Sequence, residues 1–192
     1  MNRFESGGPA HYRRQLSGSG VLLSSVPALG LPRVVLALKG WCEARALARA
    51  LPADALLLAS REPKARQTLE QAGSVYTDKR FNEVTRDEPY EGDFQARRRA
   101  YVTGTDHTGW EPRDQVVARF AEGVRFWTAR ADGRPLVIAS HGMAMTLWLT
   151  TTVALADPGA FWADLRLPGL LTVDVTGKQV FRPESDDPSG VS

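Results

Sequence analysis

The sequence predicts an α/β fold, a three-layer α/β/α sandwich with a mostly parallel central sheet. Residues 55–59 and 136–140 form two short runs that are almost wholly apolar, as expected of strands covered on both faces. A helical pattern follows each run, and strands that alternate with helices indicate a parallel sheet with helices on both sides. The chain has 192 residues, of which 43% are apolar, and this suits one globular domain with a sizeable core.

Apolar patterns and proline positions define the elements expected in the first half of the chain. A β-branched, apolar stretch favours a strand before Lys39, and one apolar helical face repeats from Trp41 to Leu51. Pro63 opens the next helix, at a position where its missing N–H costs nothing. In chain order the elements are a strand at 33–38, a helix at 41–51, a strand at 55–59, a helix from 63 to about 73 and a strand at 75–77.

The second half of the chain continues the alternation and ends in a hairpin. Val116, Phe120 and Val124 recur every fourth residue, which indicates one buried face in the longest helix. The dipeptide Thr176-Gly177 is a turn signal between two apolar segments. The expected elements are helices at 93–101 and from Pro112, a strand at 136–140, a helix at 143–155, and strands at 170–175 and 178–181.

These elements fit a single domain over residues 1–182. Residues 11–32 are rich in Gly, Ser and Pro, and we expect them to form a surface loop insertion in that domain. Residues 183–192 are polar and are predicted to be a disordered tail. The sequence contains no internal repeat and no sign of a second domain.

Charge and cysteine content exclude several classes of protein. The net charge is +2 and the charges are interspersed, so no surface for nucleic acid or membranes is predicted. The single cysteine, Cys42, excludes an intramolecular disulfide and fits a reducing cytoplasm. The first residues lack the apolar segment of a signal peptide, and no run is long enough to span a bilayer. We therefore expect a cytoplasmic protein.

The most informative segment is the strand at 136–140, which ends in Ser140-His141-Gly142 and passes directly into a helix. Ligand crevices in open α/β folds lie at the carboxyl ends of strands. The first N–H groups of the following helix are unpaired and carry a partial positive charge, so an anion can bind beside His141. A histidine that only caps the helix would explain this motif equally well. Other segments of the chain must therefore distinguish a ligand site from a helix cap.

Four segments, taken in order, resemble the histidine phosphatase superfamily, the phosphoglycerate-mutase-like proteins. Residues 38–51 are similar to the family's L-T-x-x-G-x-x-Q-A-x-x-L-A helix, and residues 59–68 resemble its S-S-P-x-x-R-A-x-Q-T turn. Residues 81–83 resemble its L-x-E acid segment, and residues 137–142 resemble its second-histidine strand. The resemblance covers about residues 36–150 and implies the phosphoglycerate-mutase-like fold.

The resemblance implies roles for several residues of this chain. His141 would stabilise the transferring phosphoryl group, and Glu83 would protonate the leaving group, unless it is only a solvated loop carboxylate. Lys64 stands where the family has a phosphate-binding arginine, and a lysine supplies charge without the planar guanidinium fork. Gly142 would lie beside the phosphate, and Arg13 could approach it from the loop insertion. The implied ligand is a small phosphorylated or anionic molecule, and the resemblance implies no cofactor and no metal. A homodimer is one assembly that the sequence leaves open.

The family's first strand ends in Arg-His-Gly, whose histidine accepts the phosphoryl group, and this chain contains no such triplet. In one register, Glu5, Ser6 and Gly7 take the three places, so that a serine replaces the histidine. In the other register, the strand before Lys39 is the first strand and Lys39 replaces the histidine. The second register uses Gly40 twice, because this glycine also fits the start of the following helix, and we prefer the first register.

The pattern leaves two functions open. A degenerate member would keep the phosphate-type pocket around His141 and bind its ligand without phosphoryl transfer. The serine that replaces the histidine, Ser6, could attack phosphorus only if His141 acted as its general base. The alternative is an active phosphomonoesterase for a small phosphorylated metabolite, with an altered nucleophile such as Ser6 or His11. The residues favour the degenerate member. An α/β-hydrolase mechanism is disfavoured, because no G-x-S-x-G nucleophile elbow is present.

Overall fold

The computed structural model describes residues 33–38, 48–88, 92–165 and 169–182. Of the predicted helix at 41–51, these residues include only the last turn, where residues 48–50 are helical. The predicted loop insertion, the predicted tail and three of the predicted site residues lie outside them: 11–32, 183–192, Ser6, Gly7 and Arg13.

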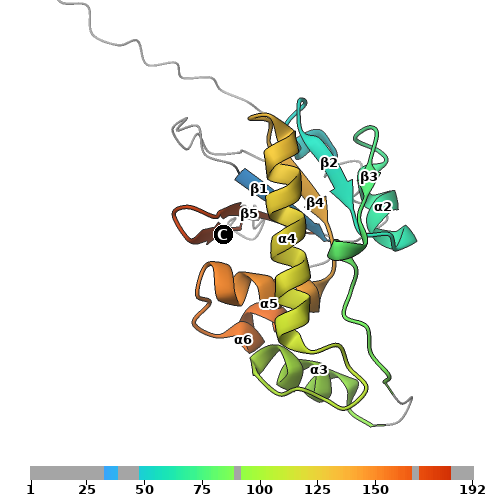
Figure 1. Ribbon diagram of the computed structural model, residues 1–192, viewed down its shortest axis with the longest axis vertical. Coiled ribbons are helices and arrows are strands. Elements are labelled where there is room, and N and C mark those ends of the chain that lie inside the picture. Colours follow the sequence, from blue (N-terminus) through green and yellow to red (C-terminus); the bar gives the residue numbers. More distant parts are fainter. Residues whose placement is uncertain (1–32, 39–47, 89–91, 166–168, 183–192) are drawn as a thin grey trace, which may run out of the picture.

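Six strands form one sheet, whose order is β3-β2-β4-β1-β5-β6. Strands β3, β2, β4 and β1 are parallel to one another, and the hairpin of β5 and β6 adds two antiparallel strands at one side. This arrangement confirms the predicted mostly parallel sheet with helices around it (Figure 1). The strands are β1 (Arg33–Leu38), β2 (Leu56–Ala59), β3 (Tyr76–Thr77), β4 (Leu136–Ala139), β5 (Gly169–Asp174) and β6 (Gln179–Phe181).

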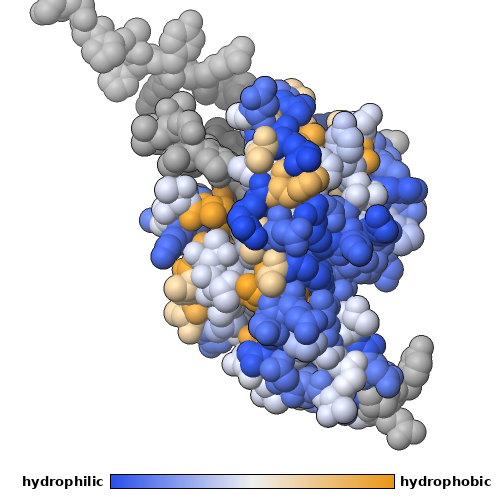
Figure 2. All heavy atoms as spheres, viewed as in Figure 1, coloured by the Kyte–Doolittle hydropathy of each residue, from blue (hydrophilic) through white to orange (hydrophobic). Residues whose placement is uncertain are grey.

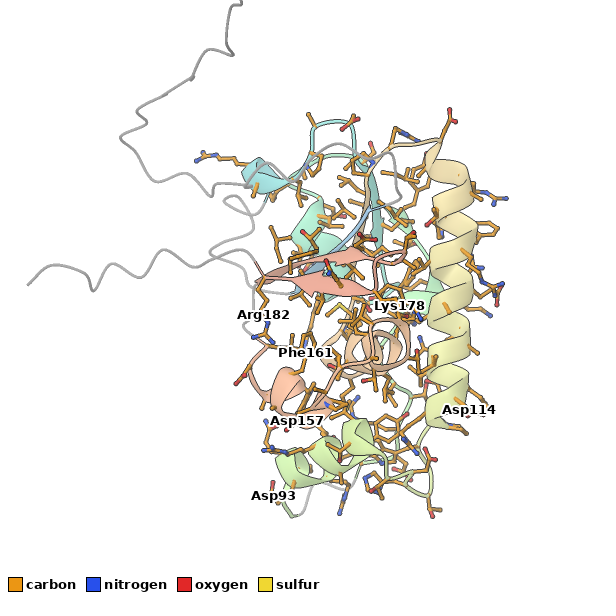
Figure 3. All side chains as sticks on the ribbon, turned by 90° about the vertical axis from the view of Figure 1, so that its left-hand side faces the viewer. Asp93, Asp114, Asp157, Phe161, Lys178 and Arg182 are labelled. Carbon is orange, nitrogen blue, oxygen red and sulfur yellow. The ribbon has the colours of Figure 1, made fainter. Side chains whose placement is uncertain are left out.

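The described helices depend on local signals as well as on burial. They are α2 (Pro63–Leu69), the short 3-10 helix η1 (Lys79–Phe81), α3 (Phe94–Thr103), α4 (Arg113–Ala131), α5 (Gly142–Thr152) and α6 (Pro158–Ala163). Asp93 and Asp157 precede α3 and α6, and their side chains accept the N–H groups of Ala96 and Ala160 at 2.9 and 2.8 Å. Figure 3 shows both aspartates at the starts of their helices. Such N-caps satisfy N–H groups that have no partner within the helix.

Successive side chains of β2 and β4 point to opposite faces of the sheet, and both faces are covered. Leu58 and Ile138 belong to the larger core, which these strands share with α4 and α5. Leu57 and Val137 belong to a smaller core that includes buried residues of α2. Apolar contacts on both sides leave no solvent-facing positions in these strands, which explains why the two strands read as continuous apolar runs.

Some helix ends differ from the predicted ones. The helix predicted at 143–155 ends at Thr152, and Ala154 soon after it has a left-handed φ of 53°, which cannot continue a helix. The helix predicted to run to Gly73 ends at Leu69. Helix α6 was not predicted, although Pro158 at its first position is a helix-opening signal. In the part of the chain described here, no helix combines the length and the apolar character needed to cross a bilayer.

The carboxyl ends of β1, β2 and β4 lie at one edge of the sheet. Ala37 in β1 and Ala59 in β2 are both register partners of Ala139 in β4. Strand β1 lies between β4 and β5, in the middle of the sheet. The segments that follow these three strands therefore start at the same edge, and Ser60 and Ser140 are the first residues of two of them.

Candidate functional site

His141 lies at the carboxyl edge of the sheet, between β4 and the first residue of α5. Its carbonyl accepts the N–H of Met145 at 3.0 Å, as the helix begins. The side chain is 15% exposed, so only a small part of the ring reaches solvent. Ring atom Nε2 lies 2.8 Å from Ser60 Oγ and 3.3 Å from Glu62 Oε1. The ends of β2 and β4 thus bring a histidine close to a serine and a carboxylate that lie far from it in the sequence.

Glu83 belongs to the same group of side chains. It follows η1, and its Oε1 accepts the N–H groups of Val84 at 3.0 Å and Ala144 at 3.1 Å. Ala144 is in the first turn of α5, where unpaired N–H groups and the helix dipole stabilise a carboxylate. The N–H of Glu83 donates to Glu62 Oε1 at 2.8 Å. One oxygen of Glu62 therefore links His141 to the backbone of Glu83.

Glu62 was given no role by the sequence prediction. It occupies the N-cap position of α2, but its side chain makes no capping hydrogen bond and instead reaches His141. A signal was present, because Glu62 lies two residues before Lys64 inside the segment that resembles the family turn. That position is a variable one in the motif, so the resemblance attached no chemistry to it.

Lys64 acts on the site through its charge. Its side chain is exposed in the first turn of α2, and its ammonium is among the groups that disfavour protonation of His141. Arg66, two residues later, pairs with Glu70 at 2.8 Å along the same helix. Lys64 therefore stands at the rim of the site, while Arg66 is engaged on the surface of α2.

Burial lowers the pKa of His141 below its usual value of 6.5. The carboxylates of Glu83 and Glu62 oppose this shift, whereas the cations of Arg119 and Lys64 add to it. The imidazole is therefore neutral at neutral pH, with one ring nitrogen as a donor and the other as an acceptor. A neutral ring interacts with an anion through a hydrogen bond and does not add a full positive charge.

The loop that carries Glu83 is fixed from two sides. Arg119 of α4 donates to one carbonyl of η1 at 2.8 Å and to two carbonyls of this loop at 2.9 and 3.2 Å, and it pairs with Glu111 at 2.7 Å. The buried hydroxyl of Ser140 donates to the carbonyl of Phe81 at 2.7 Å. Because the guanidinium donors are used in these contacts, Arg119 positions Glu83 and is not a free cation for a ligand.

A groove of about 1100 Å³ extends from Glu83 between α4 and the β3 side of the sheet. Its lining includes Arg61 and Glu83 together with the aromatic rings of Tyr76 and Trp127, but it does not include His141. Figure 2 shows that this side of the molecule is mainly hydrophilic. The groove and the surroundings of His141 therefore meet at Glu83.

The remaining predicted and candidate residues lie as follows. Gly142 is the first residue of α5 and lies against Trp162, whose Nε1 would be 3.3 Å from an added Cβ. His107 lies elsewhere, since its Nε2 is 3.0 Å from a backbone carbonyl of α3 and its ring centroid is 4.9 Å from that of Trp110. Within the described ranges, His141 is thus the one histidine at this site, and no group of three or more His, Cys, Asp or Glu is placed to hold a metal ion.

Solved structures share this fold at low sequence identity. A mycobacterial glucosyl-3-phosphoglycerate phosphatase with inorganic phosphate is 18% identical, with 84% of this chain and 100% of that chain covered and a TM-score of 0.61. YhfR from Bacillus stearothermophilus is 16% identical, with 82% and 98% covered and a TM-score of 0.61. A phosphoserine phosphatase mutant from Entamoeba histolytica in complex with phosphoserine is 12% identical, with 80% and 96% covered and a TM-score of 0.59. No curated protein matches the chain significantly.

The family assignment rests on the sequence profile together with these folds. The profile of the histidine phosphatase superfamily (branch 1) matches residues 29–180. The matched region includes His141 and Glu83, and it begins after Ser6 and Gly7. The chain therefore belongs to the histidine phosphatase superfamily, branch 1.

Proposed function

We propose that this protein is a degenerate histidine phosphatase, which binds a small phosphorylated or anionic molecule beside His141 without forming a phosphohistidine at the family's usual place. The position of β1 carries the proposal. Strand β1 lies between β4 and β5 and runs parallel to β4, so the two strands end at the same edge of the sheet. Strand β1 ends at Leu38 and Lys39 follows it, which favours the register in which a lysine replaces the histidine nucleophile.

The family match supports the same register, because it begins at residue 29, after Glu5, Ser6 and Gly7. Leu38 and Lys39 would then stand in the places of the family's arginine and histidine. A lysine ammonium is protonated at neutral pH and is no nucleophile, although it attracts an anion. The family's attacking histidine is therefore absent in both registers, while a site for an anion remains.

The pair formed by Ser60 and His141 does not supply a substitute nucleophile. A serine within hydrogen-bond distance of a histidine is the usual arrangement of an activated hydroxyl. The Ser60 side chain, however, is completely buried, and its Oγ also accepts the N–H of Glu62 at 3.2 Å. A substrate cannot reach this hydroxyl, so we assign it to holding the His141 ring in place.

An active phosphomonoesterase with an altered nucleophile is the second candidate, and the position of Glu83 favours it. Its carboxylate is held beside the first turn of α5, next to His141, where it could protonate a leaving group. Phosphoryl transfer to a protein side chain requires an attacking group as well as an acid. For the second candidate that group would have to come from a residue such as His11.

A double replacement tests the function and the register together. We expect the wild type to hydrolyse an aryl phosphate near the background rate, because positioned donors cannot replace a missing attacking group. Leu38→Arg combined with Lys39→His should raise the rate measurably above that of the wild type, since His141 and Glu83 are already held in position.

The matched control is Glu5→Arg combined with Ser6→His, which creates the same two residues in the other register. This control should leave the rate at background. Restoration in the control alone would favour the register that begins at Glu5, and brisk hydrolysis by the wild type would contradict the degenerate function.

A further inference from the structure

The contacts of Glu62 are those of an anion in a binding site. Its Oε1 lies 3.3 Å from His141 Nε2 and accepts the N–H of Glu83 at 2.8 Å. A ring nitrogen, which also lies 2.8 Å from Ser60 Oγ, and a backbone N–H therefore both lie close to a single oxygen. Backbone N–H groups and ring nitrogens are also the donors with which proteins hold a phosphate oxygen.

Glu62 lies beside His141 and is the more exposed of the two side chains. The Glu62 side chain is 39% exposed, whereas that of His141 is 15% exposed. Glu62 makes no capping hydrogen bond to α2, so a rotation of its side chain into solvent would leave the start of the helix unchanged. The exposed carboxylate can therefore turn into solvent without unfolding an element.

Two carboxylates beside His141 would repel a phosphate. Glu83 accepts two backbone N–H groups, from Val84 and Ala144, which hold its carboxylate in place. Glu62 accepts one backbone N–H, so fewer hydrogen bonds hold its carboxylate in place. At a separation of a few ångströms, repulsion between a carboxylate and a phosphate is large enough to weaken binding by about tenfold or more. For a phosphate to bind, the carboxylate of Glu62 is then the one that has to move away from His141.

We propose that Glu62 is an internal occupant of the anion subsite: its carboxylate takes the place of a phosphate oxygen beside His141, and a ligand binds only when this side chain turns away. The inference rests on the proposed function, because it assumes that the subsite beside His141 accepts a phosphate. It makes Glu62 the residue that sets the affinity of the pocket. Lys64, exposed on α2 two residues later, would not compensate for both carboxylates.

Titration of the full chain with inorganic phosphate, followed by calorimetry, tests this inference. Glu62→Gln removes the charge and keeps the shape, whereas Glu62→Ala also vacates the space. Both variants should bind phosphate at least about tenfold more tightly than the wild type. Glu70→Gln, on the same helix but paired with Arg66, is the matched control and should bind like the wild type. Thermal unfolding establishes that each variant is folded.

A second measurement locates the bound phosphate. Phosphate added to Glu62→Gln should shift the NMR signals of the His141 ring and leave those of His107 unchanged. If wild type and variants bind phosphate equally, Glu62 is not the occupant, although the proposed function stands. If phosphate binds none of them, the phosphate subsite itself is refuted together with this inference.

Discussion

The protonation state of His141 determines how the site would interact with the proposed anionic ligand. Burial favours the neutral ring, and the carboxylates of Glu83 and Glu62 only partly offset that preference. Attraction of an anion therefore has to come from positive groups other than the ring, such as the ammonium of Lys64 at the rim. This balance is a property of single side chains, and it can be measured through pH.

The stability of the folded protein should depend on pH through His141. The pKa of this ring is lower in the folded than in the unfolded chain, so the unfolded chain binds more protons between the two values. The protein should therefore lose stability as the pH falls below about 6.5, and His141→Asn should not show this part of the loss. Urea unfolding between about pH 8 and pH 5 measures both curves. Parallel curves for wild type and variant would contradict the shift.

Among the elements, the contact between α4 and η1 decides where Glu83 lies. Gly123 of α4 faces Phe81 of η1, and an added Cβ would be 2.8 Å from Phe81 Cζ. The rings of Phe81 and Phe120 meet edge to face, with 5.1 Å between their centroids. The helix approaches η1 this closely because residue 123 has no side chain. The loop that follows η1 is thereby brought to Arg119 and to the sheet edge.

Replacement of Gly123 by alanine tests this close approach. Helix propensity alone would stabilise the protein by about 1 kcal/mol. Overpacking of a buried contact costs about 1–3 kcal/mol, and the ring of Phe81 is completely buried, so we expect a net loss. Ala129→Gly, at an exposed position of the same helix, should lose about 1 kcal/mol from propensity alone. Urea unfolding gives both values, and a stabilised Gly123→Ala would show that the two elements are not in tight contact.

For the molecule as a whole, the alternation of apolar strands and helices was sufficient to predict the sheet. Strands β2 and β4 are local apolar runs, and each lies where its pattern indicated. The place of β1 was not predictable in the same way, because its pairing with β4 and β5 joins segments that are far apart in the chain. From the sequence, a short match at Glu5, Ser6 and Gly7 and the strand before Lys39 could therefore both be aligned with the family's first strand.

The site was predictable to a similar degree. His141 and Glu83 are each part of a local motif, and the structure brings them to one edge of the sheet. Glu62 and Arg119 reach the same place from α2 and α4, and contacts between separate elements leave no pattern in the sequence of either element. Local motifs therefore point to the residues that resemble family counterparts, and they give no signal for the residues that contact them from other elements.

In the proposed function, this chain has lost the group that takes the phosphoryl from a substrate. Pre-steady-state hydrolysis of an aryl phosphate by the full chain tests it directly, because a covalent phosphoenzyme releases an initial burst of phenol equal in amount to the protein. We predict no burst from the wild type. A stoichiometric burst that disappears in His11→Ala or in Lys39→Ala would contradict the account, since it would show that a nucleophile has survived in this fold.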